Sequence, residues 1–326
     1  MLSRVADSIF WMGRYTERVE NYARFIDVNF NLSIDLPPGV KEQWAPLVAT
    51  TGDDELYRSI HGANHSRECV MHFLAFDNRN LNAIISSVGK ARENARIVRE
   101  NIPKETWEVL NELYFFMKDA VERKIWKSED PRECFREIRN QVQLLNGIAD
   151  ANIPKTQEWY FSRLGQFLER ADKTSRILDV KYHYLLPSVA EVGSPLDFLQ
   201  WTALLKSVSG YNSFRREYGK ITPRDVVEYM VFNRYFPRSI LYCLMAAEDC
   251  LHEISESQRG YSNPPEKKMG NLRSELEFAD IDDLFAHGLH EYMDKLQSRI
   301  NTISAAVHQQ YFKIQPNFPQ QAQNQA

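Results

Sequence analysis

Residues 13–28 read Gly-Arg-Tyr-Thr-Glu-Arg-Val-Glu-Asn-Tyr-Ala-Arg-Phe-Ile-Asp-Val, and residues 165–180 read Gly-Gln-Phe-Leu-Glu-Arg-Ala-Asp-Lys-Thr-Ser-Arg-Ile-Leu-Asp-Val. The two stretches align without a gap at a spacing of 152 residues, and six of the sixteen positions are identical. Four of those six are charged. Duplicated structural helices usually keep their apolar positions while the polar face drifts, so the preserved charges are the feature of this repeat that needs an explanation.

Both copies are predicted to be helices. Apolar residues recur every three or four positions, which gives each helix one apolar stripe. The same spacing continues through most of the chain, where glycine is sparse and strict alternation is rare. We therefore predict an all-α fold. The stripes consist of Met12, Tyr15, Val19, Tyr22 and Ile26 in the first copy and of Leu164, Phe167, Ala171, Thr174 and Leu178 in the second.

The repeat spacing predicts two similar halves, and a chain of 326 residues is long enough for each half to bury a core. We expect residues 1–150 and 151–310 to be two helical bundles of about five to seven helices each, related by an approximate two-fold axis. Residues 311–326 are rich in Gln, Asn and Pro and are expected to be a disordered polar tail. Breaks between helices are expected at Pro37-Pro38-Gly39 and, as a mobile loop, from Ser255 to Lys268.

Composition excludes several classes of function. The formal net charge is -4 and the basic residues alternate with acids, so no nucleic-acid partner is expected. The longest uninterrupted apolar stretch, Ile240–Ala247, is too short to cross a bilayer, and no membrane association is expected. The four cysteines are scattered and form no Cys-x-x-Cys pair, which favours a reduced, cytoplasmic location.

The repeated charges form one stripe on each helix, opposite the apolar stripe. A solvated face with weak surface ion pairs is one interpretation. Recurrence at the same helical phase favours another, in which the two stripes face each other across a cleft or the two-fold axis. They would then form a buried ion network or a site for a ligand that carries both amine and carboxylate. The candidate residues are Arg14, Glu17, Arg18, Glu20, Arg24 and Asp27 with Glu169, Arg170, Asp172, Arg176 and Asp179.

A second candidate site is the segment Phe236-Pro237-Arg238-Ser239-Ile240. Pro and Ser at a predicted helix start leave free N–H groups, and Arg238 adds positive charge, so the segment is either an anion site or an ordinary helix start. Arg238 and Ser239 therefore join the candidate ligand-binding residues. The corresponding segment of the first half, Asn80-Leu81-Asn82-Ala83-Ile84, lacks the Pro-Arg-Ser sequence.

No cofactor and no metal is expected. The sequence contains no phosphate-binding or dinucleotide-binding glycine motif, no His-Glu-x-x-His and no Gly-x-Ser-x-Gly. A di-iron bundle needs Glu-x-x-His on two helices, whereas this chain offers one Asp-x-x-His at Asp249 and His252. The remaining paired histidines are interpreted as loop and surface residues: His61, His65, His287 and His290.

These segments together resemble the bacterial alpha-E domain family of helical proteins. The resemblance spans the chain apart from the tail, and its motifs occur in order. They are Met1–Tyr15 with Glu17-Arg18, then Leu164-Gly165, Leu168–Asp172, Leu178–Lys181 and Pro237-Arg238-Ser239. One departure is Gln166, where the family pattern has Arg and where the first copy has Arg14. We expect it to leave the site of the second copy with one cation fewer.

Members of that family are typically encoded beside, or fused to, circularly permuted ATP-grasp ligases, and transglutaminase-like peptidases and proteasome-related hydrolases are often near. The resemblance therefore implies a circularly permuted ATP-grasp ligase as a partner. It also implies a transglutaminase-like peptidase as a further candidate partner and a peptide as the substrate of the system.

Three functions remain as hypotheses. The first is an accessory or partner protein of an ATP-grasp peptide or amide ligase, which binds the peptide or the ligase through the charged stripes. The second is an enzyme acting on peptide or amide bonds, with Glu17 or Glu169 as a general acid or base whose pKa is raised by burial among carboxylates. The third is a non-catalytic helical scaffold in which the repeated charges hold the two halves together.

Overall fold

The computed structural model describes residues 1–36, 41–184, 193–257 and 261–313. All regular structure in these ranges is helical, which confirms the predicted all-α class. The α-helices are α1 (Ser3–Ile34), α2 (Ala45–Thr51), α3 (Asp54–His61), α4 (Arg67–Met71), α5 (Ile84–Ile97), α6 (Lys104–Glu122), α7 (Arg132–Asn152), α8 (Gln157–Tyr184), α9 (Pro195–Ser207), α10 (Tyr211–Glu217), α11 (Pro223–Phe232), α12 (Ile240–Ser255), α13 (Pro264–Glu277), α14 (Ile281–His287) and α15 (Leu289–Val307). Two short 3₁₀ turns, η2 (Arg99–Asn101) and η3 (Ile125–Lys127), and two π-helical segments, η1 (His72–Phe76) and η5 (His308–Phe312), complete the described elements.

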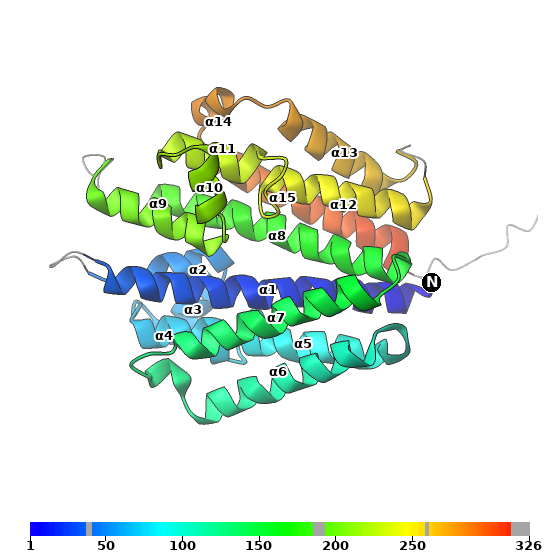
Figure 1. The fold of residues 1–326 in the computed structure, drawn as a ribbon, viewed down its shortest axis with the longest axis horizontal. Coiled ribbons are helices and arrows are strands. Elements are labelled where there is room, and N and C mark those ends of the chain that lie inside the picture. Colours follow the sequence, from blue (N-terminus) through cyan, green and yellow to red (C-terminus); the bar gives the residue numbers. More distant parts are fainter. Residues whose placement is uncertain (37–40, 185–192, 258–260, 314–326) are drawn as a thin grey trace, which may run out of the picture.

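Helices α1 and α8 run side by side and in the same direction through the middle of the molecule (Figure 1). Helices α5, α6 and α7 lie on the side of α1, and α12, α13 and α15 lie on the side of α8 (Figure 1). Two of the shorter helices pack on the central helix of the other half of the chain: α2 packs on α8, and α9 packs on α1. Both members of the repeat are therefore central helices. None of the described helices has the length and apolarity that crossing a lipid bilayer requires.

The repeated glycines let α1 and α8 approach closely. A Cβ atom on Gly13 would lie 2.2 Å from the backbone oxygen of Ser162, and one on Gly165 would lie 2.2 Å from that of Phe10. Heavy atoms cannot approach to 2.2 Å without a bond, so any other residue at either position would push the two backbones apart. The identity of glycine in both copies thus has a packing cause.

Both faces of the two central helices are buried. The predicted apolar stripes are buried apart from Tyr15 and Phe167, which are half-buried. The opposite, charged face is buried as well: Glu17 and Glu169 have no exposed surface. A helix enclosed on all sides usually has few charges, so the charged residues here must be paired with one another. The interpretation of the stripes as solvated faces was wrong.

Several helix starts agree with the sequence analysis. Ser66 accepts a hydrogen bond from the backbone N–H of Cys69 at the start of α4, and Thr222 does the same for Asp225 at the start of α11. Ser239 caps α12 by accepting from the N–H of Tyr242. These caps satisfy backbone donors that the first turn of a helix leaves without a partner.

Other boundaries differ from the prediction. The expected break at Pro37-Pro38-Gly39 lies outside the described residues, and α1 already ends at Ile34. The loop predicted from Ser255 to Lys268 was wrong in its last part, because α13 begins at Pro264 with a side-chain cap from Asn263. The polar tail was expected from residue 311, but Phe312 belongs to η5 and is buried with its ring 5.4 Å from that of Phe10. Residues 314–326 lie outside the described ranges.

Candidate functional site

Glu17 is the centre of one group of charges between α1 and α8. Arg170 donates two hydrogen bonds to its carboxylate, from Nε to Oε1 at 2.9 Å and from Nη2 to Oε2 at 2.7 Å. Arg238, in the turn before α12, donates from Nη1 to Oε1 at 3.0 Å. The amides of Asn21 and Gln166 donate to the two oxygens at 3.0 and 3.2 Å. Both oxygens of this buried carboxylate thus accept hydrogen bonds from protein donors.

Glu169 is the centre of a second, similar group. Arg18 donates from Nε to Oε1 at 2.7 Å and from Nη2 to Oε2 at 3.1 Å. Arg14 donates from Nε to Oε2 at 2.9 Å, and the Lys173 ammonium lies 3.7 Å from Oε1. Bidentate guanidinium–carboxylate pairs of this kind have short, strong and directional hydrogen bonds.

The two groups are reciprocal. Each copy of the repeat contains a Glu-Arg pair, and the Glu of one helix binds the Arg of the other: Glu17 with Arg170 and Glu169 with Arg18. The two stripes therefore meet directly along the contact between α1 and α8. Neither stripe lines an open cleft at these residues, because both glutamates are completely buried.

Further acids and cations extend each group along the helices. Glu20 pairs with Arg24 and also with Arg238, whose Nη2 lies 2.8 Å from Oε2. Asp172 pairs with Arg176 and Lys173, each at 3.0 Å. We name the first group the Glu17 cluster, composed of Glu17, Glu20, Arg24, Arg170 and Arg238. We name the second the Glu169 cluster, composed of Glu169, Asp172, Arg14, Arg18, Lys173 and Arg176.

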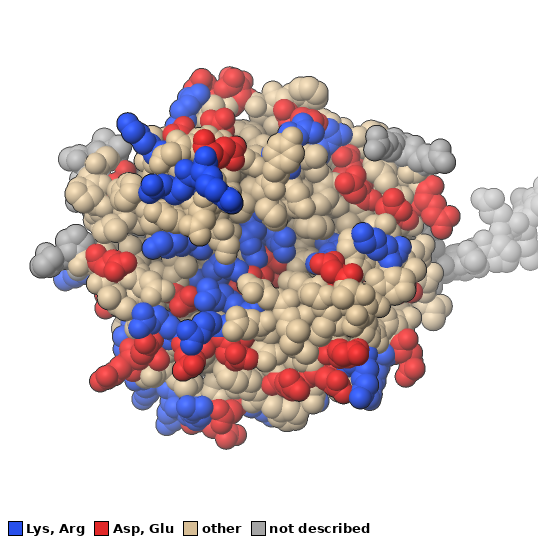
Figure 2. Space-filling model, in the orientation of Figure 1, with Lys and Arg blue, Asp and Glu red and all other residues tan. Residues whose placement is uncertain are grey.

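The two clusters contain more cations than acids. By these definitions seven Lys and Arg side chains face four carboxylates. The surplus N–H groups go to neutral oxygens, for example Arg14 to the Ser304 hydroxyl and Arg18 to the Asn82 side chain. On the face shown in Figure 2, Lys and Arg side chains gather across the middle of the molecule, over α1 and α8, with acids mostly nearer the rim. With seven cations and four carboxylates, the two clusters together carry a formal charge of +3.

The electrostatics of the two glutamates correct the prediction of a raised pKa. Burial by itself raises the pKa of Glu17, but Arg170 and Arg238 outweigh it and hold that pKa well below 4.5. The pKa of Glu169 is likewise lowered, because Arg18 and Arg14 outweigh the effect of burial. Both carboxylates are consequently ionised and firmly hydrogen-bonded at neutral pH. A general base in either position would be a weak one.

The predicted site residues at the ends of the two stripes make their contacts outside the two clusters. Asp27 binds Arg139 of α7, with Nη2 3.0 Å from Oδ2, and Asp179 binds His290 of α15 at 2.6 Å. Ser239 has the role of a helix cap, as expected of an ordinary helix start. The proposed anion site there does not match the geometry, because the guanidinium of Arg238 is already bound to two glutamates of the Glu17 cluster.

Gln166 donates a hydrogen bond to a different glutamate from the one expected. Its Nε2 donates to Glu17 at 3.2 Å, whereas Arg14, its counterpart in the first copy, binds Glu169. The replacement of Arg by Gln thus removes a cation from the Glu17 cluster and not from the site of the second copy. Each glutamate is bound by residues of the opposite helix. A prediction made within each copy of the repeat could not show this.

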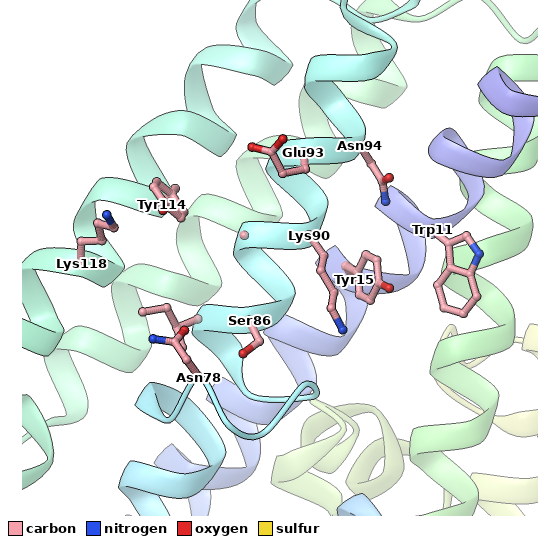
Figure 3. A pocket seen from close by; sticks show the side chains of 11 residues that line it. Trp11, Tyr15, Asn78, Ser86, Lys90, Glu93, Asn94, Tyr114 and Lys118 are labelled. Atoms are coloured by element: carbon pink, nitrogen blue, oxygen red, sulfur yellow. The ribbon is translucent and has the colours of Figure 1, made fainter.

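An open groove lies beside the Glu169 cluster, between α1, α5 and α6 (Figure 3). Its volume is about 720 Å³. Trp11 stacks on Tyr15, and the Lys90 ammonium points to the Tyr15 ring, 5.4 Å from its centroid (Figure 3). Arg14 and Arg18 lie over the Trp11 and Tyr15 rings at 5.2 and 5.5 Å, so the groove is in contact with the buried network. Aromatic rings with cations are common in surfaces that bind peptides.

A cluster of metal-ligating side chains was missed in the sequence. His61, His72 and Asp77 place one ligand atom each within 4.8 Å of one another. His61 had been interpreted as a loop residue, but it is the last residue of α3 and half-buried. The spacings of 11 and 5 residues match no common metal motif, and the contact depends on the π-helical segment η1. The expectation of no metal stays a prediction, and this cluster is the place where it can be tested.

The chain belongs to the Alpha-E family, whose model matches residues 1–312 and is described as a predicted alpha-helical domain with a conserved ER motif. Two Glu-Arg pairs of this chain, at 17–18 and 169–170, supply the reciprocal contacts between α1 and α8. The geometry thus gives a physical reason for a Glu-Arg motif: one residue pairs with the opposite helix as an acid and the next as a base.

Relatives were found in mycobacteria. An uncharacterized protein of Mycobacterium bovis (strain ATCC BAA-935 / AF2122/97) and one of Mycobacterium tuberculosis (strain CDC 1551 / Oshkosh) are each 24% identical to this chain over 325 residues. The matches cover 91% of this chain and 35% of each relative. The chain therefore spans about a third of the length of the curated relatives that it matches. No solved structure matches this fold.

Proposed function

We propose that this protein is a non-catalytic helical scaffold that acts as the accessory or partner subunit of an ATP-grasp peptide or amide ligase, in the cytoplasm. One observation carries the choice of scaffold over enzyme. Glu17 and Glu169 are completely buried, and both are bound by guanidinium groups from the opposite helix. A general base must come within hydrogen-bond reach of its substrate and have a pKa near the working pH. Neither glutamate meets these conditions.

In this proposal the repeated charges act as a lock between α1 and α8. Residues 1–150 and 151–310 would be two copies of one unit, and the reciprocal pairs of Glu17 with Arg170 and of Glu169 with Arg18 support that interpretation. Removing one partner of a buried pair leaves an uncompensated charge and costs about 3–5 kcal/mol. A strong lock of this type suits a rigid platform on which another protein docks.

The length of the relatives supports the idea of a partner. In the mycobacterial proteins the matching stretch is about a third of a longer polypeptide, so that stretch is joined there to further chain. A domain with that arrangement commonly works beside a neighbouring domain. The four cysteines are free, which agrees with a reduced compartment. The resemblance to the alpha-E family points to a circularly permuted ATP-grasp ligase as the neighbour, with a transglutaminase-like peptidase as a further candidate.

The groove beside the Glu169 cluster is the surface that we assign to the partner or its peptide. Its aromatic rings supply rigid contact area, and Lys90 and Lys118 supply positive charge at its edges. The surplus of buried cations beneath it adds attraction for acidic groups. The occupant expected from this chemistry is a segment of the ligase, or of its peptide, that carries both carboxylates and apolar side chains.

The test uses the purified protein and the ATP-grasp ligase of the same host. We expect a complex of equal stoichiometry by analytical ultracentrifugation, weakened at least about tenfold in a Lys90→Glu, Lys118→Glu double variant. The matched control is Lys104→Glu, which changes an exposed lysine at the start of α6, outside the groove. This control should bind as the wild type does. Absence of any complex would refute the partner proposal, and amide-bond activity of the isolated chain would refute the scaffold proposal.

A further inference from the structure

A second site lies away from the network, where α3 meets the segment that leads to α5. The potential ligand atoms of His61, His72 and Asp77 all lie within 4.8 Å of one another. His72 Nδ1 lies 3.8 Å from Asp77 Oδ2. Asp77 is buried and the two histidines are half-buried, so the cluster is enclosed on one side and open to solvent on the other.

The π-helical segment η1 brings two of these residues together. Residues five apart on an α-helix point about 140° away from each other. Here the backbone N–H of Asp77 donates to the carbonyl oxygen of His72 at 2.9 Å, and this bond between residues five apart closes the wider turn. Both side chains consequently lie on the same side. Single π turns inside helices occur frequently at functional sites.

The third ligand, His61, has a nitrogen without a partner. Its Nε2 is buried and makes no hydrogen bond, so a bound water or ion would satisfy it. Its ring is held in place by Tyr57 and Phe73, with centroids 4.9 and 6.2 Å away. The ring of His72 is held by Trp126 at 4.6 Å. Packing of this type orients imidazole ligands before an ion arrives.

Arg79 competes for the carboxylate. It donates from Nε to Asp77 Oδ1 at 3.0 Å and from Nη2 to Oδ2 at 2.6 Å. The arginine side chain is 61% exposed, so it can turn into solvent at little cost and leave one oxygen of Asp77 for an ion. The pair thus lowers the affinity for a cation without blocking the site.

We propose that His61, His72 and Asp77 bind a divalent transition-metal ion of the zinc class. Two imidazoles and one carboxylate are a ligand set that occurs in zinc sites whose fourth position is left to water. Zinc at about 2.0–2.1 Å from each ligand would hold the three donor atoms roughly 3.3 Å apart. The rings and the carboxylate must therefore close by at most about 1.5 Å, which side-chain rotation provides. The bound ion would tie the end of α3 to the π turn.

The experiment titrates tag-free protein, stripped with a chelator, with zinc by calorimetry and with cobalt by visible absorption. We expect one equivalent of each ion, a cobalt spectrum of tetrahedral type, and a higher melting temperature with zinc. His61→Asn should weaken binding by more than about 100-fold, since even the loss of an outer partner of a metal ligand costs roughly 10–100-fold. This variant loses no hydrogen bond of Nε2. Its melting temperature without metal shows whether loss of the ring contacts with Tyr57 and Phe73 disturbs the fold.

Two further variants make the outcome decisive. Arg79→Gln removes the competing cation and should strengthen zinc binding by about threefold to tenfold. His287→Asn is the matched control: it removes a histidine at the end of α14, outside the cluster, and should bind zinc as the wild type does. The proposal is overturned if the wild type takes up no zinc or cobalt. It is equally overturned if His61→Asn binds as well as the control.

Discussion

The Glu17 cluster and the Glu169 cluster both neutralise a buried carboxylate, but they use different residues to do so. Each buries a carboxylate under a two-pronged arginine from the opposite helix. The further cation of the Glu17 cluster comes from Arg238, in the turn before α12, while Glu169 receives Arg14 and Lys173 from the two central helices themselves. The pairing between helices is thus fixed, and the source of the additional charge is free to differ.

This difference has an energetic consequence. If Glu17 is removed, Arg238 retains Glu20, at 2.8 Å, and Arg170 retains the carbonyl oxygen of Pro237. If Glu169 is removed, two arginines, Arg14 and Arg18, lose their only acid within ion-pair distance among the described residues and keep only the neutral oxygens of Ser304 and Asn82. Removal of Glu17 does this to one arginine, Arg170. The Glu169 cluster is therefore the more vulnerable of the two.

The largest expected effect is that of Glu169→Gln. It leaves two buried arginines, Arg14 and Arg18, without an acid and should lower the free energy of unfolding by about 3–5 kcal/mol. Glu17→Gln should cost less, by about 1–2 kcal/mol, because only Arg170 loses its acid while Arg238 keeps Glu20. Urea denaturation followed by circular dichroism measures both. Equal losses in the two variants would break the comparison.

The next effect concerns the glycines at the contact. Gly13→Ala and Gly165→Ala each place a methyl group 2.2 Å from a backbone oxygen and should cost about 1–3 kcal/mol. The two losses should be similar, because a Cβ atom at either position would meet a backbone oxygen at 2.2 Å and a backbone carbon at 3.1 Å.

Gly147→Ala is the matched control for these two variants. It lies in α7 with nothing near its Cβ position, and it should stabilise the helix by up to about 1 kcal/mol. Melting temperatures of the three variants would contradict the packing argument if Gly147→Ala were as harmful as the other two.

A smaller effect is expected in acid. Because the folded pKa values of Glu17 and Glu169 lie below 4.5, the unfolded chain binds more protons at low pH. Each carboxylate therefore contributes fully above about pH 4.5, and its contribution falls by at most about 1.4 kcal/mol for each pH unit below that. Glu169→Gln should show a shallower decline of stability between pH 4.5 and 3 than the wild type. A parallel decline would indicate that Glu169 is not ionised in the folded state.

The smallest effect on stability is expected at the helix starts, where α12 has a side-chain cap and α5 has none. Ser239 caps α12, whereas Ala83 at the start of α5 provides no side-chain hydrogen bond. Ser239→Ala should cost about 1 kcal/mol. It should not change the binding of Arg238 to Glu17, which a crystal structure of the variant would check. A loss of that contact would mean that the cap also positions the network.

Local patterns allowed the helices to be predicted. The apolar stripes, the caps at Ser66 and Thr222 and the all-α class all depend on residues within one or two turns, where periodicity and capping rules apply. The repeated charges also favoured the interpretation in which the two stripes face each other, and Glu17 with Arg170 and Glu169 with Arg18 do meet. Asp27 and Asp179 of the same predicted group bind other helices. The predicted helices, caps and stripes need no knowledge of distant contacts.

Contacts between residues far apart in the sequence could not be predicted. Nothing in the sequence shows that Gln166 faces Glu17, or that arginines would reverse the effect of burial on the pKa of both glutamates. The cluster of His61, His72 and Asp77 escaped because a π turn breaks the three-to-four periodicity on which the helical wheel rests. Sequence periodicity places residues on faces, and the partner of each face depends on packing.

A double-mutant cycle on Glu17 and Arg170 tests the central claim, that reciprocal pairs lock α1 onto α8, most directly. The free energies of unfolding of Glu17→Gln, Arg170→Gln and the double variant are compared with the wild type. The lock predicts that the double variant loses about 1–3 kcal/mol less than the sum of the two single losses. Single losses that add within about 0.5 kcal/mol would show no coupling across the helices and would contradict it.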